Sequence, residues 1–196
     1  MTTMHSPRSL ALFFVAALFF AGCGAKNAET PEPETEAEGE TVETASPAYL
    51  GKAAPDFVLK TLDGKDFRLS DHRGDVVLIN FWATWCGPCV IETPELVKMY
   101  NELHDKGFTV VGISLDEEGF EVVAPFAKEY EVSYPLVVDD GTVAEEFGGV
   151  FGLPTTYVLD KNGNIQQRFI GIFPTKEMRP VIEKMLEEPF VEMTSG

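Results

Sequence analysis

The chain has 196 residues, 44% of them hydrophobic, and a formal charge of −17 at pH 7. This length fits one domain with additional segments, and the hydrophobic content is ordinary for a globular protein. The negative charge argues against nucleic acid as a partner, because phosphate groups would be repelled. The three cysteines, Cys23, Cys86 and Cys89, are too few for a disulfide-stabilised scaffold.

Residues 1–22 have the layout of a secretory signal peptide. Arg8 supplies a positive charge, residues 10–20 are apolar, and two small residues precede Cys23. The apolar run is shorter than the roughly 20 residues that a membrane span needs. The segment Phe-Ala-Gly-Cys at 20–23 resembles a bacterial lipobox, which implies that Cys23 is lipidated and anchors the chain to a membrane. The alternatives are an ordinary cleaved signal with a coincidental cysteine, or an uncleaved anchor.

Residues 24–48 form an acidic segment with seven glutamates, one lysine and three prolines. A segment of this composition can bury too little apolar surface to fold, and repulsion between its like charges keeps it extended. We therefore expect residues 23–48 to be a disordered tether, starting at the lipidated Cys23. The folded domain is expected over residues 49–193, which hold 13 Lys and Arg against 25 Asp and Glu.

The first part of this domain predicts a hairpin, a buried strand and a helix. Two short alternating runs, 54–60 and 66–70, flank an Asp-Gly turn, which is a hairpin signal. Residues 76–82 are almost all apolar, as in a central strand buried on both faces. Apolar residues recur at helical spacing over 90–103, and Pro94 is expected to interrupt and kink that helix.

The remaining elements continue the alternation of strands and helices. We expect the following elements, in chain order: a strand at 108–115, a helix at 120–130, an extended segment at 134–139, a brief helix at 142–147, strands at 156–160 and 166–170 around an Asn-Gly turn, and an amphipathic helix at 176–187. This order predicts an α/β fold with a mixed central sheet flanked by helices, plus an extra N-terminal hairpin.

Cys86 and Cys89 lie where the predicted strand at 76–82 ends and the next helix begins. A Cys-x-x-Cys pair at such a place predicts a dithiol that cycles to a disulfide and back. Unpaired backbone N–H groups and the helix dipole favour a thiolate at Cys86, which we expect to be exposed. Cys89 lies one turn further and is expected to be more shielded. Cys86 would then attack a substrate disulfide, and Cys89 would resolve the mixed disulfide.

Two other uses of the cysteine pair are disfavoured. A zinc site needs two further good ligands, and the chain offers only His5, in the signal segment, His72 and His104. An inert structural disulfide would stabilise little, because closing so short a loop removes little chain entropy. We expect no metal and no cofactor beyond the redox-active disulfide.

The motif Trp-Cys-Gly-Pro-Cys at 85–89, preceded by Phe-Trp-Ala, resembles thioredoxin. The wider pattern resembles the exported thiol–disulfide oxidoreductases of the TlpA/ResA type. It adds Ala-Pro-Asp-Phe at 54–57 and Gly-Leu-Pro-Thr-Thr at 152–156, and covers residues 54–188. The resemblance implies a thioredoxin-like fold over essentially the whole domain.

The same resemblance implies roles for individual residues. The peptide bond between Leu153 and Pro154 should be cis and face the cysteines, with the backbone beside it pairing with the substrate chain, and Trp85 should lie on the rim of the site. Glu92 matches a glutamate typical of the group, which implies that its carboxylate takes a proton from Cys89. A solvated helix residue is the alternative for Glu92. Asn80 stands where thioredoxin carries a buried Asp; since an amide cannot accept that proton, we expect a buried amide satisfied by backbone.

The implied activity is reduction of disulfides in exported proteins, for example apocytochrome c, with electrons from a membrane thiol donor. The protein would be a lipid-anchored monomer in the bacterial cell envelope, facing the periplasm if the cell is Gram-negative. A peroxidase of the related AhpC/TSA class is the alternative, but its Pro-x-x-x-Thr-x-x-Cys motif is not matched, since Asn80 stands four residues before Thr84. A copper-delivery module would use a wider Cys-x-x-x-Cys pair and a distal His, whereas no His follows His104.

Overall fold

The computed structural model describes residues 50–190. Several predictions fall outside this range and stay predictions. They are the signal segment, the lipidation of Cys23, the acidic tether and the last residues, 191–193, of the folded domain. Among the described residues, no helix combines the length and apolar character needed to cross a membrane.

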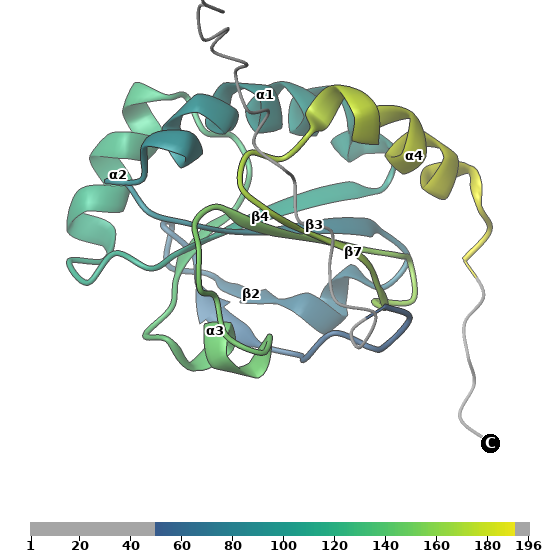
Figure 1. The fold of residues 1–196 in the computed structure, drawn as a ribbon, viewed down its shortest axis with the longest axis horizontal. Helices are drawn as coiled ribbons and strands as arrows, with labels where there is room; N and C mark the ends of the chain where they lie inside the picture. The colour runs from purple at the N-terminus through teal and green to yellow at the C-terminus, as the bar shows by residue number, and fades with distance from the viewer. Residues whose placement is uncertain (1–49, 191–196) are drawn as a thin grey trace, which may run out of the picture. The chain divides into compact units, whose positions relative to one another are not determined.

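A five-stranded mixed sheet forms the centre of the described residues, in the order β5-β4-β3-β6-β7. Figure 1 labels three of its strands, β3, β4 and β7. Its strands are β3 (Val76–Trp82), β4 (Phe108–Ser114), β5 (Leu136–Val138), β6 (Thr155–Leu159) and β7 (Ile165–Ile170). Strands β3, β4 and β5 run parallel, whereas β6 is antiparallel to both β3 and β7. The predicted mixed sheet is therefore confirmed.

The N-terminal hairpin is a separate two-stranded sheet of β1 (Val58–Lys60) and β2 (Asp66–Arg68). Its turn contains Gly64 with a φ of +80°, a conformation that glycine adopts at little cost. The 3-10 helix η1 (Leu69–His72) then leads towards β3. The hairpin agrees with the sequence prediction.

The segment that carries this hairpin also lies along both edges of the central sheet. Beside β5, Thr61 forms an antiparallel bridge with Val137. Beside β7, the N–H of Gly51 donates to the carbonyl of Ile165, and the N–H of Ile165 donates to the carbonyl of Lys52. Part of the outer backbone of each edge strand is thus hydrogen-bonded.

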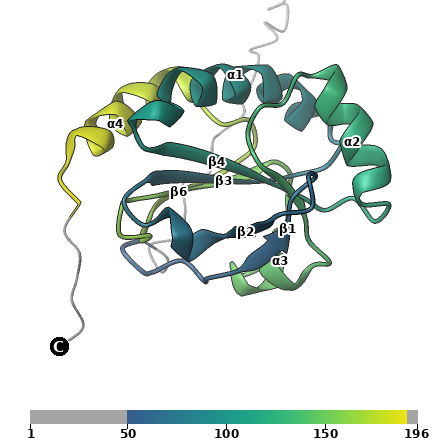
Figure 2. The same cartoon turned by 180° about the vertical axis from the view of Figure 1, so that it is seen from behind.

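Helices cover one face of the sheet, and the hairpin covers the other (Figures 1 and 2). The helical face carries α1 (Gly87–Leu103), α2 (Phe120–Glu129) and α4 (Thr175–Glu187), and the opposite face carries β1, β2 and α3 (Thr142–Glu146). A 3-10 helix, η2 (His104–Lys106), follows α1. Each face has its own hydrophobic core.

Strand β3 supplies side chains to both cores because successive strand residues point to opposite faces. Leu78 and Trp82 belong to the core under the helices, whereas Ile79 and Phe81 belong to the core under the hairpin. The same alternation places Asn80 on the helical face, towards α1. A polar residue in the most buried strand therefore points to the helix that begins at the cysteine pair.

Helix α1 begins at Gly87, directly after Cys86, as predicted for the cysteine pair, and its first turn contains Pro88, a residue that fits a helix start. The helix continues past Pro94 to Leu103, so the predicted interruption at Pro94 is wrong. Packing of Leu96, Met99 and Leu103 against the sheet keeps the helix whole, since burial of each such side chain contributes about 1.5–3 kcal/mol.

Candidate active site

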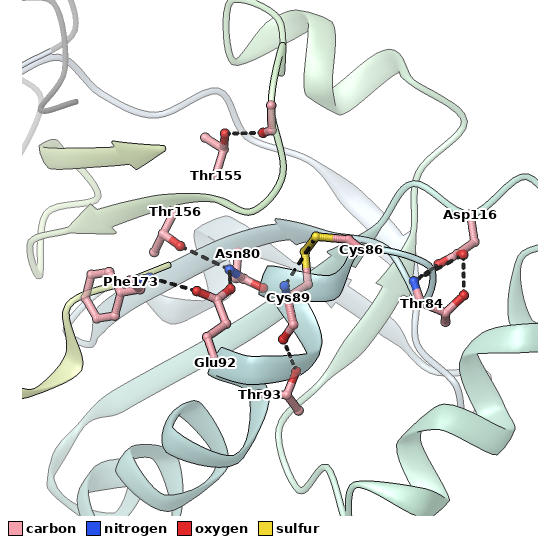
Figure 3. The surroundings of a disulfide bond; sticks show 11 residues. Asn80, Thr84, Cys86, Cys89, Glu92, Thr93, Asp116, Thr155, Thr156 and Phe173 are labelled. Carbon is pink, nitrogen blue, oxygen red and sulfur yellow. Dashed lines mark hydrogen bonds between the residues drawn. A yellow bond between two sulfur atoms is a disulfide. The ribbon is translucent and has the colours of Figure 1, made fainter. Parts of the chain in front are cut away.

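Cys86 and Cys89 form a disulfide at the N-terminus of α1 (Figure 3). Cys86 is the N-cap residue of the helix, and the backbone N–H of Cys89 donates to the Cys86 sulfur at 3.3 Å. The first N–H groups of a helix have no partner within it. The sulfur of Cys86 therefore occupies a position where backbone N–H groups and the helix dipole favour a negative charge.

The exposure predicted for Cys86 is wrong for the oxidised protein. Cys86 is 5% exposed and Cys89 is 1% exposed, so both residues are buried, although Cys86 remains the more accessible of the two. The disulfide holds the Cys86 sulfur against Cys89, whereas the preceding residue, Trp85, is 71% exposed. Trp85, not the cysteine, forms the exposed rim of the site.

Cys86 opens into a groove of about 480 Å³. The residues that line it come from the loop before α1, the first turn of α1, the segment after β4 and the loop before β6: Trp85, Cys86, Gly87, Pro88, Leu115, Val150, Phe151, Gly152 and Leu153. The Leu153–Pro154 peptide bond is cis, as the resemblance implied. Leu153 lines the groove, while Pro154 itself is buried. Two of the predicted substrate-binding residues, Trp85 and Leu153, thus share one groove with Cys86.

Glu92 lies on the turn of α1 that follows Cys89 and is 2% exposed. Its Oε1 accepts a hydrogen bond from the Asn80 amide at 2.8 Å, and its Oε2 accepts one from the backbone N–H of Phe173 at 2.8 Å (Figure 3). The alternative of a solvated helix residue is therefore wrong. The carboxylate is held by two donors from two other segments of the chain.

Burial raises the pKa of Glu92 from 4.5 to about 7, because a charged carboxylate is disfavoured away from water. The hydrogen bonds from Phe173 and Asn80 act in the opposite direction and lower this pKa, but they do not outweigh burial. Near neutral pH the carboxyl group is thus present in both protonation states. Such a group can accept a proton and release it again without a large change in pH.

Asn80 is satisfied by side chains, not by backbone as the sequence analysis expected. Its amide nitrogen donates to Glu92 Oε1 and, at 3.0 Å, to the Thr156 hydroxyl. The resemblance could not reveal this pairing, because Thr156 is distant in the sequence and only the antiparallel register of β3 and β6 places it opposite Asn80. Asn80 therefore orients the carboxylate that lies beside the disulfide.

Asp116 is a site residue that the sequence analysis missed. This buried carboxylate accepts hydrogen bonds from the Thr84 backbone N–H at 3.0 Å, the Thr84 hydroxyl at 2.6 Å and the Ser114 hydroxyl at 2.7 Å. It thereby fixes the loop between β3 and Cys86. A signal was present: β4 ends in Ser114 and is followed, after Leu115, by Asp116, and the carboxyl ends of neighbouring parallel strands meet at one edge of a sheet.

Within residues 50–190, no cluster of three or more His, Cys, Asp or Glu side chains could hold a metal ion. The groups that this site offers for chemistry are the two sulfurs, a buried carboxylate and backbone N–H groups. A disulfide at a helix N-terminus, beside a groove and a proton-accepting group, is the arrangement of a thiol–disulfide exchange site.

Solved structures with this fold define the class. A thioredoxin-family thiol:disulfide interchange protein from Chlorobium tepidum TLS superposes with a TM-score of 0.64 at 30% identity, over 69% of this chain and 97% of that chain. A secreted thiol-disulfide isomerase from Corynebacterium glutamicum superposes with a TM-score of 0.67 at 28% identity, over 78% of this chain and 95% of that chain. The fold is thioredoxin-like, and the class is that of the thiol–disulfide oxidoreductases.

The sequence comparisons narrow this class to a family. The family model described as AhpC/TSA matches residues 50–168. The thiol-disulfide oxidoreductase ResA of Bacillus thuringiensis is 34% identical over 136 residues, which are 69% of this chain and 78% of that protein. The thioredoxin-like protein YneN of Bacillus subtilis is 39% identical over 134 residues, 68% of this chain and 78% of that protein. The chain belongs to the AhpC/TSA family and is a thiol–disulfide oxidoreductase similar to ResA.

Proposed function

We propose that the protein is a disulfide reductase of the cell envelope, which reduces disulfides of exported proteins through Cys86 and Cys89. The observation that carries this proposal is the buried carboxyl group of Glu92, one helical turn after Cys89 and with a pKa of about 7. The inner thiol of a Cys-x-x-Cys pair must lose a proton before it can attack, and Glu92 is placed to receive it.

The first step is attack by the Cys86 thiolate on one sulfur of a substrate disulfide. A bond forms between Cys86 and that sulfur, the substrate disulfide breaks, and the other substrate sulfur leaves as a thiolate that takes a proton from water. The Cys89 N–H, 3.3 Å from the Cys86 sulfur in the oxidised protein, favours the attacking thiolate.

The second step resolves the mixed disulfide. Cys89 transfers its proton to Glu92 and attacks the Cys86 sulfur, and the second substrate sulfur leaves as a thiolate. The Cys86–Cys89 disulfide is then restored and the substrate has gained two electrons. A membrane dithiol would return two electrons to the protein and leave as a disulfide itself.

Sequence features support the proposed cellular location of the protein and the proposed direction of electron transfer. Residues 1–23 resemble a lipoprotein signal, and one structural neighbour is described as secreted. The Cys-Gly-Pro-Cys motif resembles that of reducing thioredoxins, whose potential is about −270 mV. We therefore propose a lipid-anchored, monomeric reductase outside the cytoplasm, with apocytochrome c as one example of a substrate.

The match to the AhpC/TSA family model makes a thiol peroxidase the second candidate function. The hydroxyl of Thr84 donates to Asp116 at 2.6 Å and so serves the loop, which argues against a role in peroxide binding. Stopped-flow mixing of the reduced protein with hydrogen peroxide distinguishes the two functions. Rapid peroxide consumption that Cys86→Ser abolishes would favour the peroxidase.

The test of the reductase is substrate trapping with Cys89→Ser. This variant keeps the attacking thiol but cannot resolve the mixed disulfide, so it should accumulate covalent complexes with exported proteins that mass spectrometry identifies. Cys86→Ser is the matched control and should trap nothing. The equilibrium reduction potential, measured against glutathione, tests the direction of electron transfer. Strongly oxidising proteins of this kind have potentials of about −120 mV, and a value in that region would contradict a reductase.

A further inference from the structure

We propose that Phe151 is a specificity-determining residue, which together with Trp85 selects extended substrate segments that carry apolar residues beside the target cysteine and basic residues further out. The proposal rests on the proposed function, since disulfide exchange at Cys86 is what makes the groove a substrate site. Phe151 and Trp85 are called the aromatic pair below.

The aromatic pair is exposed to solvent, whereas most large apolar side chains of the described residues are buried. Phe151 is 90% exposed and Trp85 is 71% exposed. A single exposed apolar residue needs no explanation, but these two come from separate loops and line the same groove as Cys86. The aromatic residues Tyr, Trp and Phe are enriched at protein interfaces. A partner that brings a disulfide to Cys86 must pass between or beside them.

The position of Phe151 is built into the fold. A Cβ atom at position 149 would lie 2.7 Å from its ring, so the ring rests on the bare backbone of Gly149, whose φ is +85°. The N–H of Gly149 donates to the carbonyl of Ala144, and Arg168 donates to the carbonyl of Gly149 at 3.4 Å. The aromatic ring is therefore presented on an anchored loop, and such preorganisation reduces the entropy cost of binding.

The charges around the groove indicate what lies further out on the substrate. No charged side chain lines the groove itself. The exposed residues Glu117 and Glu118 follow Leu115, which lines it, and the exposed residues Glu145 and Glu146 precede the loop that carries Phe151. Opposite charges across an interface favour encounter and specificity. The occupant that fits is an extended segment, apolar next to its cysteine and with Lys or Arg beyond.

The groove size agrees with a short segment. Its volume of about 480 Å³ lies within the range of pockets, roughly 300–1,000 Å³, that enclose small ligands. It can hold a few side chains but not a folded surface. Selection would therefore act on the residues directly flanking the cysteine, which an unfolded or flexible substrate presents.

The experiment measures the rate at which the reduced full-length protein, in detergent, reduces three synthetic peptides with one internal disulfide. The first has leucines beside its cysteines and lysines beyond, the second replaces the leucines by serines, and the third replaces the lysines by glutamates. Glutathione disulfide serves as a small substrate that cannot fill the groove. The wild type should prefer the first peptide to the second by about tenfold, the size expected for a contact worth about 1.4 kcal/mol.

Phe151→Ala should reduce that preference to less than threefold. Phe151→Trp should retain the preference, because an aromatic ring is restored. Phe190→Ala, which removes an exposed aromatic residue beside Gly74, at the far end of β3 from the cysteines, is the matched control and should behave like the wild type.

Equal rates of the wild type with the leucine and serine peptides would overturn the proposal, as would a preference that Phe151→Ala leaves intact. Equal rates with the lysine and glutamate peptides would overturn its electrostatic part. A wild type that reduces neither the peptides nor glutathione disulfide would contradict the proposed reductase itself. The two failures are therefore distinguishable.

Discussion

Replacing Glu92 by Gln tests whether the buried carboxyl group is the proton acceptor of the site. Its pKa is about 7 in the folded protein, against 4.5 for an ordinary glutamate. Between these two values the folded state holds a proton that the unfolded state releases, so stability must fall as the pH rises from about 4.5 to 7. At about 1.4 kcal/mol for each pKa unit, the loss is about 3 kcal/mol.

The assay is urea unfolding of the oxidised protein at several pH values across this window. Glu92→Gln has no carboxyl group to titrate, so the free energy of unfolding of the wild type relative to this variant should fall by about 3 kcal/mol between pH 4.5 and 7. Glu95→Gln, an exposed position on the same helix, is the control and should leave the wild-type pH dependence unchanged. Parallel curves for wild type and Glu92→Gln would refute the reasoning.

The same substitution has a kinetic consequence. Resolution of a mixed disulfide should accelerate in the wild type as the pH rises through about 7, because the carboxylate form of Glu92 accepts the proton of Cys89. Glu92→Gln should slow this step at least about a hundredfold near neutral pH, the lower end of the usual contribution of general base catalysis. Release of a thiol from a preformed mixed disulfide on Cys86 measures the step directly.

Three further predictions concern the surroundings of the site. Asn80→Ala removes a hydrogen bond that lowers the pKa of Glu92, so the pH profile of resolution should move upward by up to about one unit. Asp116→Ala leaves three donors without their acceptor and should cost about 2–3 kcal/mol in urea unfolding, whereas Asp105→Ala, an exposed control, should cost less than about 0.5 kcal/mol. Leu78→Ala, in the core under the helices, should cost about 2–5 kcal/mol. A pH profile that does not move, or Asp116→Ala and Leu78→Ala unfolding like the wild type, would contradict these assignments.

The order of strands and helices could be predicted because each element carries its own periodicity. The almost entirely apolar run of β3 matches its burial on both faces, and the Asp-Gly turn matches the hairpin of β1 and β2. The continuity of helix α1 was less predictable. Pro94 opposes a helix by its local chemistry, yet packing of the apolar face of α1 on the sheet outweighs that local cost.

Within the site, local residues were predictable and long-range pairs were not. The cysteine pair, its position at the helix start and the cis bond before Pro154 followed from motifs a few residues long. The hydrogen bond from Phe173 to Glu92 joins residues 81 positions apart, and the one from Thr84 to Asp116 joins residues 32 positions apart. Such pairs depend on how the sheet brings distant segments together, which no short motif encodes.

The N-terminal segment along both edges of the sheet has a consequence for encounters between copies of the protein. Strand edges with free N–H and C=O groups recruit strands from neighbouring molecules and so begin aggregation. Here the bridge between Thr61 and Val137 occupies part of one edge, and the hydrogen bonds of Gly51 and Lys52 with Ile165 occupy part of the other. At these positions the edge strands have fewer free N–H and C=O groups to offer, which disfavours the joining of sheets when two copies collide.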